Sequence, residues 1–222
     1  MIQTAIASFL TASIITASAS MSVNLASNTA QPQQAQAQIA SRAMSLNTRY
    51  GYELASNVYK DNILLNLAYL NGTVKSKNDI NWDNLHKPMV MEFTLEPGQR
   101  FAYHATTLLE YSENVVITTN SNFGAGDGYK YEGGLYGMGV CHLASLIHWA
   151  ALDAGLESIV PSNHDFYPIP EVPKQYGVAI YSNPNSLAAS AKQNLYIKNT
   201  LDSKVTFRFD FDGINLKVTV LK

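Results

Sequence analysis

The C-terminal stretch alternates between apolar and polar residues over two segments that a turn separates. The apolar positions are Val205, Phe207, Phe209 and Phe211 in the first segment, and Ile214, Leu216, Val218 and Val220 in the second. Asp212-Gly213 stands between them, and an Asp-Gly pair is a strong hairpin signal. A period of two directs one set of side chains to the core and the other to water. The sequence therefore predicts an antiparallel hairpin whose buried face needs a packing partner.

A glycine-rich segment, residues 133–139, runs directly into an apolar segment that begins at Cys141. The apolar residues recur with the spacing of one helix face: Leu143, Leu146, Ile147, Ala150 and Ala154. Gly155 follows this run and is a typical helix stop. We therefore expect an α+β fold in which a central helix starting at Cys141 packs against an antiparallel sheet that contains the C-terminal hairpin.

Other elements are expected along the chain from the same kinds of pattern. Helical spacing covers residues 52–70, and a short helix is expected over residues 39–50 and another over 78–86. Strands are expected over residues 90–95, 114–119, 177–181 and from Leu195 onward, with a turn region over 182–192. Residues 158–173 hold four prolines and should form a stiff, irregular segment.

The N-terminal residues differ from the rest of the chain in composition. Residues 1–27 are apolar and small, with Ala-Ser-Ala around residues 17–19, which is typical of a secretory signal or of a weak membrane anchor. No Lys or Arg precedes the apolar run, which leaves a disordered N-terminus as an alternative. Residues 28–50 are rich in Gln and Ala and predict a linker. We therefore expect one folded domain over residues 51–222, with membrane association through the N-terminal segment as a further expectation.

Composition excludes several classes of function. Charged residues make up 14% of the 222 residues and the formal net charge is -2, with no basic run, so no nucleic acid partner is expected. A single cysteine excludes an internal disulfide. The histidines and acids lack the spacing of a metal site, and no phosphate-binding loop is present. We therefore expect neither a metal nor a cofactor.

Cys141 suggests thiol chemistry because it lies at a predicted helix N-terminus, where the helix dipole favours a thiolate. A nucleophilic thiol needs a base, and His164 on the proline-rich segment is the preferred candidate, with Asp165, Glu171 or an amide orienting it. His142 points away from Cys141 on a helix, and His148 lies two turns further along, so neither is well placed to act as the base. The alternative is that Cys141 is a small buried hydrophobic residue.

These motifs carry a resemblance to a known family. The chain contains Gly137-Met138-Gly139-Val140-Cys141-His142 and, further on, Ala154-Gly155-Leu156. These two segments resemble the Gly-Gly-Gly-Val/Ile-Cys-Gln and Ala-Gly-Leu motifs of the VanW family. The family is named after an accessory protein of vancomycin B-type resistance clusters. The segments 97–103 and 195–200 resemble two further family motifs, and the similarity spans roughly residues 60–222. The resemblance implies an extracytoplasmic bacterial protein of the cell envelope, secreted or anchored to the membrane.

Two functions stay open at this level. One is a cysteine-dependent amide hydrolase or transferase acting on peptidoglycan, with Cys141, His164 and Asp165 as catalytic residues. The other is a non-catalytic domain that binds or organises the cell wall, holding a wall peptide or glycan in a groove of glycines and tyrosines. The residues expected to contact the ligand are Tyr136, Gly137, Gly139, His142 and Ser145, with Tyr129 and Tyr131 in the same groove. The second reading is favoured by departures from the family pattern, such as His142 in place of Gln and the absence of an aspartate after Pro173.

Overall fold

A computed structural model describes residues 36–222 of the chain. The signal-like segment predicted for residues 1–27 lies outside this range. Within the described residues, none of the helices combines the length and the apolar character needed to cross a membrane.

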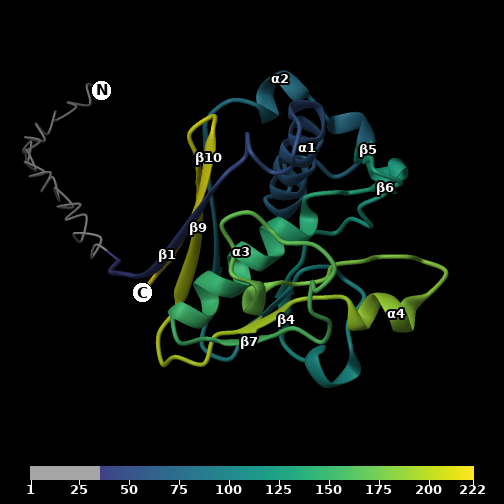
Figure 1. Cartoon of the computed structure of the whole chain (residues 1–222). Helices are drawn as coiled ribbons and strands as arrows, with labels where there is room; N and C mark the ends of the chain where they lie inside the picture. The colour runs from purple at the N-terminus through teal and green to yellow at the C-terminus, as the bar shows by residue number, and fades with distance from the viewer. Residues whose placement is uncertain (1–35) are drawn as a thin grey trace, which may run out of the picture. The chain divides into compact units, whose positions relative to one another are not determined.

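The main sheet has four antiparallel strands in the order β1 (Gln38–Ser45), β10 (Asn215–Leu221), β9 (Val205–Phe211) and β2 (Met89–Leu95) (Figure 1). The predicted C-terminal hairpin is confirmed, with Phe209 opposite Val218 in the register. β2 pairs with the other edge of β9, so that Phe93 lies opposite Phe207. Both β9 and β10 are therefore central strands of this sheet.

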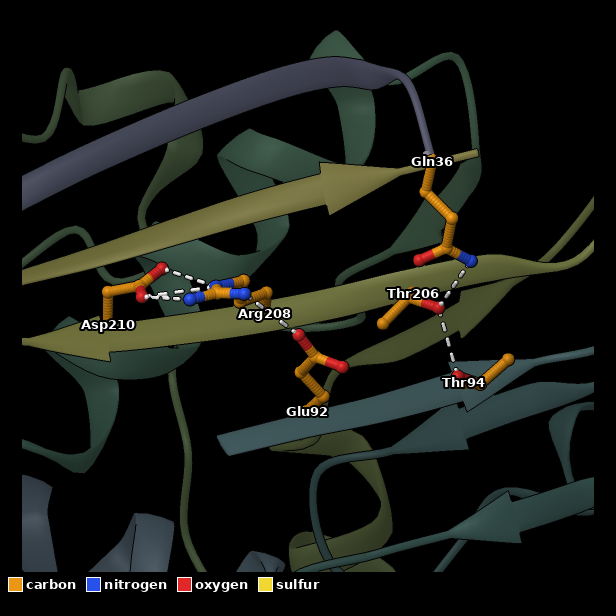
Figure 2. Close-up of polar contacts among 6 residues, drawn as sticks. All are labelled: Gln36, Glu92, Thr94, Thr206, Arg208 and Asp210. Carbon is orange, nitrogen blue, oxygen red and sulfur yellow. Dashed lines mark hydrogen bonds and ion pairs between the residues drawn. The ribbon is translucent and has the colours of Figure 1, made fainter. Parts of the chain in front are cut away.

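The alternation along β9 separates two faces of the sheet. Its phenylalanines are buried, and Phe93 stacks on Phe207 with ring centroids 4.9 Å apart. Figure 2 shows the polar contacts of the opposite face among Gln36, Glu92, Thr94, Thr206, Arg208 and Asp210. The Thr206 and Thr94 hydroxyls lie 3.0 Å apart, and Arg208 binds Asp210 at 3.0 Å. Because the Arg208 pair is exposed to solvent, it contributes little to stability, which comes from the phenylalanine face.

Two helices complete the core against this sheet. α3 (Val140–Asp153) packs on β1 and β10, and α1 (Glu53–Leu70) packs on α3 (Figure 1). The side chains of Leu143, Leu146 and Ile147 on α3 are fully buried. The expected α+β fold, with a helix beginning beside Cys141 and packed on the sheet of the C-terminal hairpin, is confirmed.

A second, mixed sheet has its strands in the spatial order β4 (Val115–Ile117), β3 (Arg100–Ala102), β8 (Tyr196–Lys198) and β7 (Glu157–Ile159). The buried Asn199 amide donates to Leu95 O at 2.9 Å and so links the end of β8 to the end of β2. The remaining short elements are α2 (Trp82–Leu85), α4 (Leu187–Lys192) and the ribbon of β5 (Tyr131–Glu132) with β6 (Leu135–Tyr136).

Three predicted elements differ from the structure. The short helix expected over residues 39–50 is wrong, because residues 38–45 form β1 and extend the sheet into the predicted linker. Pairing with β10 supplies the backbone hydrogen bonds of β1 and buries Ala40 and Met44, which outweighs the helix preference of the Ala-rich sequence. Residues 177–181 were expected to form a strand, but their pairing is one isolated bridge, in which Val178 pairs with Asn163. The region 182–192, expected to be a turn, ends in helix α4.

Candidate functional site

A cleft of about 630 Å³ opens beside the N-terminus of α3. Its lining comes from Tyr50 and α1, from residues 122–124, from the β5–β6 segment with the glycine loop and first turn of α3, and from segments that follow α3 in the sequence. The aromatic residues and histidines that line it are Tyr50, Tyr59, Phe123, Tyr131, Tyr136, His142, His164, Phe166, Tyr167 and Tyr181. None of the residues that line it is Asp, Glu, Lys or Arg. The cleft is therefore an uncharged, mainly aromatic site of the size that holds small ligands.

One buried amide fixes the segment that forms the cleft wall. The side chain of Asn62 on α1 donates to Lys130 O at 3.1 Å and to Met138 O at 3.0 Å, and accepts from Lys130 N–H at 2.7 Å. Asn62 is fully buried, so each of these bonds replaces one that water would otherwise provide. Asn62 thus joins both ends of the segment 130–138, which carries Tyr131 and Tyr136.

Gly137 and Gly139 line the cleft, and the backbone requires glycine at both positions. Both have a positive φ, 72° and 105°. A Cβ on Gly139 would lie 2.7 Å from Tyr59 O, and a Cβ on Gly137 would lie 2.8 Å from Phe123 O. These glycines therefore allow the loop to approach α1 and the 121–124 segment closely.

Cys141 is the second residue of α3 and lines the cleft, but its thiol is held by the backbone of Ile180. Ile180 N–H donates to Sγ at 3.4 Å, and the thiol donates to Ile180 O at 3.7 Å. Burial raises the pKa of Cys141 to about 11, against the smaller opposing effect of the Ile180 N–H. Burial therefore opposes the thiolate that the helix N-terminus was expected to favour.

His142 and His164 lie close together at the cleft, with ring centroids 6.4 Å apart. Their exposed fractions are 5% and 7%. Burial lowers the pKa of His142 to about 3, and it lowers the pKa of His164 against the smaller effects of neighbouring backbone groups and Asp165. Both imidazoles are therefore neutral at pH 7. Nδ1 of each ring is enclosed and has no hydrogen-bond partner among residues 36–222.

The groups expected to orient His164 do not do so. Asp165 is exposed and lines a second hollow of about 140 Å³, which His164 and Lys174 also line. The carboxylate of Glu171 binds the buried guanidinium of Arg49 at 2.6 Å and accepts from Ser45 N–H at 2.9 Å. Glu171 therefore ties the proline-rich segment to the end of β1. His164 is placed instead by its backbone, whose N–H donates to Gly177 O at 3.1 Å.

Two of the residues expected in the ligand groove, Ser145 and Tyr129, are buried and form hydrogen bonds within the fold. Ser145 is fully buried; it donates to Cys141 O at 2.7 Å and accepts from Val178 N–H at 2.8 Å. It thereby holds the segment that contains Ile180 against α3. Tyr129 is also buried, and its hydroxyl accepts from Asn66 at 3.0 Å. Neither residue is part of the cleft lining, whereas Tyr131, Tyr136 and His142 are.

The sequence analysis missed the α1 side of the cleft and the aromatic residues after His164. Tyr59 is 4% exposed and lies 4.9 Å from the His142 ring, centroid to centroid. Tyr50 stacks on Tyr59 and on Tyr167 at 5.7 Å each. A signal was present in α1: Asn62 and Asn66 interrupt an otherwise apolar run, which is the pattern of buried polar residues with specific partners.

The described residues thus form an α+β domain around an uncharged aromatic cleft, with one thiol and two neutral imidazoles at its base. Residues 84–221 match the family model described as VanW like protein, which covers more than half of the chain. The chain belongs to this VanW-like family. No curated protein and no solved structure matches it. The matched region starts after β1 and α1, so Tyr50, Tyr59 and Asn62 lie outside it.

Proposed function

We propose that this domain binds an uncharged glycan of the cell envelope in the aromatic cleft and does so without covalent chemistry. The observation that carries the proposal is the lining of the cleft, in which aromatic side chains predominate and no acidic or strongly basic side chain takes part. A charged ligand would lose its water in such a site without gaining a partner charge. A sugar ring offers a flat C–H face that stacks on an aromatic ring, and hydroxyls that form hydrogen bonds at its edge.

The rim of the cleft supports the same proposal. Tyr131, Tyr136, Phe166 and Tyr167 remain substantially exposed, with Phe166 at 77%. Large aromatic side chains clustered on a surface are typical of a binding site, because they offer apolar area and lose little side-chain entropy when a ligand covers them. The same rings lie on separate segments of the chain, so a bound polymer would contact both sides of the cleft.

The pKa of Cys141 supports a non-catalytic role. A thiol whose pKa is raised to about 11 has little thiolate at pH 7, and both imidazoles lack the hydrogen-bonded carboxylate that orients a catalytic base. These features favour binding over nucleophilic catalysis.

Binding to purified peptidoglycan tests the proposal. The full chain should sediment with insoluble peptidoglycan, and Tyr136→Ala and Phe166→Ala should each weaken binding about fivefold because each removes one stacking face. Leu109→Ala is the matched control, since Leu109 is 91% exposed and lies outside the cleft. Absence of sedimentation, or equal losses in all three variants, would contradict the proposal.

A second candidate function rests on the fact that Cys141 and His164 line the same cleft. In that case the protein cleaves or transfers an amide of peptidoglycan through the Cys141 thiol. Mass spectrometry of peptidoglycan fragments incubated with the protein distinguishes the two functions. Products that appear with the unaltered chain and not with Cys141→Ala would establish the enzyme and refute the purely binding role.

The proposed location is outside the cytoplasm, with the apolar residues 1–27 directing export or anchoring the chain. A fusion of these residues to alkaline phosphatase lacking its own signal tests this, because that enzyme becomes active only after export. An inactive fusion that is made at normal levels would refute export by this segment.

A further inference from the structure

The two histidines at the base of the cleft have an arrangement that the stacking of sugar rings does not use. His142 and His164 are both more than nine-tenths buried, both line the cleft, and Nδ1 of each has no partner among residues 36–222. Such orphaned polar atoms are uncommon in folded proteins and require an explanation.

The unpartnered Nδ1 atoms determine which ring nitrogen carries the proton. A neutral imidazole has one N–H donor and one bare acceptor nitrogen. A proton on the enclosed Nδ1 would be a buried donor without an acceptor, so the favoured tautomer places the proton on Nε2. Both residues line the cleft, and neither Nε2 is among the enclosed atoms without a partner, so Nε2 is the ring nitrogen left to donate to a ligand. The base of the cleft therefore presents two neutral N–H donors.

These donors define the group that they can bind. They carry no charge, so they match a neutral acceptor better than a carboxylate or phosphate, which would need a cation nearby. An amide carbonyl is a strong neutral acceptor with two lone pairs, and it can accept from two N–H groups at once. Tyr59 packs against the His142 ring, with centroids 4.9 Å apart, and supplies apolar surface beside that ring.

We infer that His142 and His164 bind the carbonyl oxygen of an acetamido group, so that the ligand of the cleft is a glycan of N-acetylated amino sugars. The inference rests on the proposed function, because it assumes that the aromatic rim stacks on sugar rings. It adds the chemical group that distinguishes the ligand from other neutral glycans. A site built to hydrogen-bond one group discriminates strongly against an analogue that lacks it, because the buried donors are then left unpaired.

Calorimetry with two matched trisaccharides tests the inference on the full chain. The probes are the β-1,4-linked trimer of N-acetylglucosamine and the β-1,4-linked trimer of glucose, which differ only at the acetamido position. We expect the acetylated trimer to bind at least tenfold more tightly. His142→Phe and His164→Phe should reduce this ratio to near one, because they keep the aromatic ring and remove the donor.

Two further variants separate recognition from folding. His142→Gln keeps an N–H donor and should retain part of the preference, even if His142→Phe alters the packing beside Tyr59. His148→Gln is the matched control: His148 is a buried histidine of the same helix, but it binds Ser158 Oγ at 2.7 Å and lies outside the cleft. It should leave the ratio unchanged.

The outcomes distinguish failure of the inference from failure of the proposed function. Equal binding of the two trimers would overturn the role of the histidines and leave glycan binding intact. A preference that persists in folded His142→Phe and His164→Phe would overturn it as well. Binding of neither trimer, together with no sedimentation on peptidoglycan, would overturn the proposed function.

Discussion

The Cys141 thiol lies between the N–H and C=O groups of Ile180, with Sγ 3.4 Å from the nitrogen and 3.7 Å from the oxygen. This backbone clamp fixes the sulfur at the edge of the cleft while burial keeps it protonated. The sulfur is therefore part of the wall that the 178–181 segment and α3 form together.

Cys141 should react slowly with thiol reagents in the folded protein. With its pKa raised to about 11, the thiolate fraction at pH 8 is roughly two-hundredfold below that of an ordinary cysteine with a pKa of about 8.5. The rate of alkylation by iodoacetamide, followed by mass spectrometry from pH 7 to pH 11, should keep rising up to the highest pH. The same measurement in urea supplies the unfolded reference. A rate that levels off near pH 7 would contradict the raised pKa.

Gly139→Ala should destabilise the protein more than Gly213→Ala. Both glycines have a φ of 105°, so the conformational strain of alanine is comparable, about 1–3 kcal/mol. The Cβ on Gly139 would also lie 2.7 Å from Tyr59 O, whereas the Cβ on Gly213 meets no atom within 4 Å. Urea denaturation should therefore show a further loss of about 1–3 kcal/mol for Gly139→Ala. Equal losses would show that the loop can move away from α1 at no cost.

Asn62→Leu should loosen the cleft wall as well as lower the stability. The substitution leaves Met138 O and Lys130 N–H without partners, at about 1–3 kcal/mol for each group left buried, whereas Lys130 O keeps the Gly137 N–H at 3.3 Å. Hydrogen exchange at residues 130–138 should become faster, since the opening of this segment then costs less. Asn66→Leu is the control, because Asn66 forms a single side-chain bond to the Tyr129 hydroxyl and does not contact that segment. Unchanged exchange in Asn62→Leu would refute the clamp.

The free energy of unfolding should fall as the pH drops below 6.5. Burial lowers the pKa of His142 to about 3 and that of His148 to about 4 in the folded protein, from the ordinary value of 6.5. At a pH between the pKa in the folded protein and 6.5, the unfolded chain binds protons that the folded chain does not. The free energy of unfolding then falls by up to about 1.4 kcal/mol per histidine for each unit by which the pH decreases. Above pH 6.5 neither contributes to the pH dependence.

Urea denaturation at pH 7, 6 and 5 checks this dependence. His148→Gln removes one of the buried histidines whose pKa is lowered, so its stability should fall less steeply with decreasing pH than that of the unaltered chain. The comparison of slopes cancels the effect of the carboxylates, which are the same in both proteins. Parallel pH profiles would show that His148 titrates normally in the folded state.

The parts of the fold that the sequence predicted are those with strong local patterns. The alternation in residues 205–220 and the apolar face of α3 identified the hairpin and the helix that cover each other. β1 could not be identified in this way, because its sequence, Gln-Ile-Ala-Ser-Arg-Ala-Met-Ser, does not alternate between apolar and polar residues. Its conformation depends on pairing with β10, some 170 residues away in the sequence. Such long-range pairing overrides local preference.

Only the part of the candidate site that contains the glycine and cysteine motif could be predicted from the sequence. The sequence pointed to the segment 136–142 and to His164, and the structure brings these together in one cleft. The pKa of Cys141 had the opposite direction from the prediction, because the closeness of Ile180 and the loss of solvent depend on tertiary packing. Tyr59 and Phe166 belong to segments whose position beside the cleft no local pattern encodes.

The backbone groups of Ala37 and Lys222 bond to each other in both directions, each at 2.8 Å. The two ends of the described residues, 36–222, therefore lie next to each other. A sequence joined to either end would leave the domain from the same corner of the main sheet. A short bridge between these ends, with the chain reopened in an exposed loop, would preserve every contact that shapes the cleft.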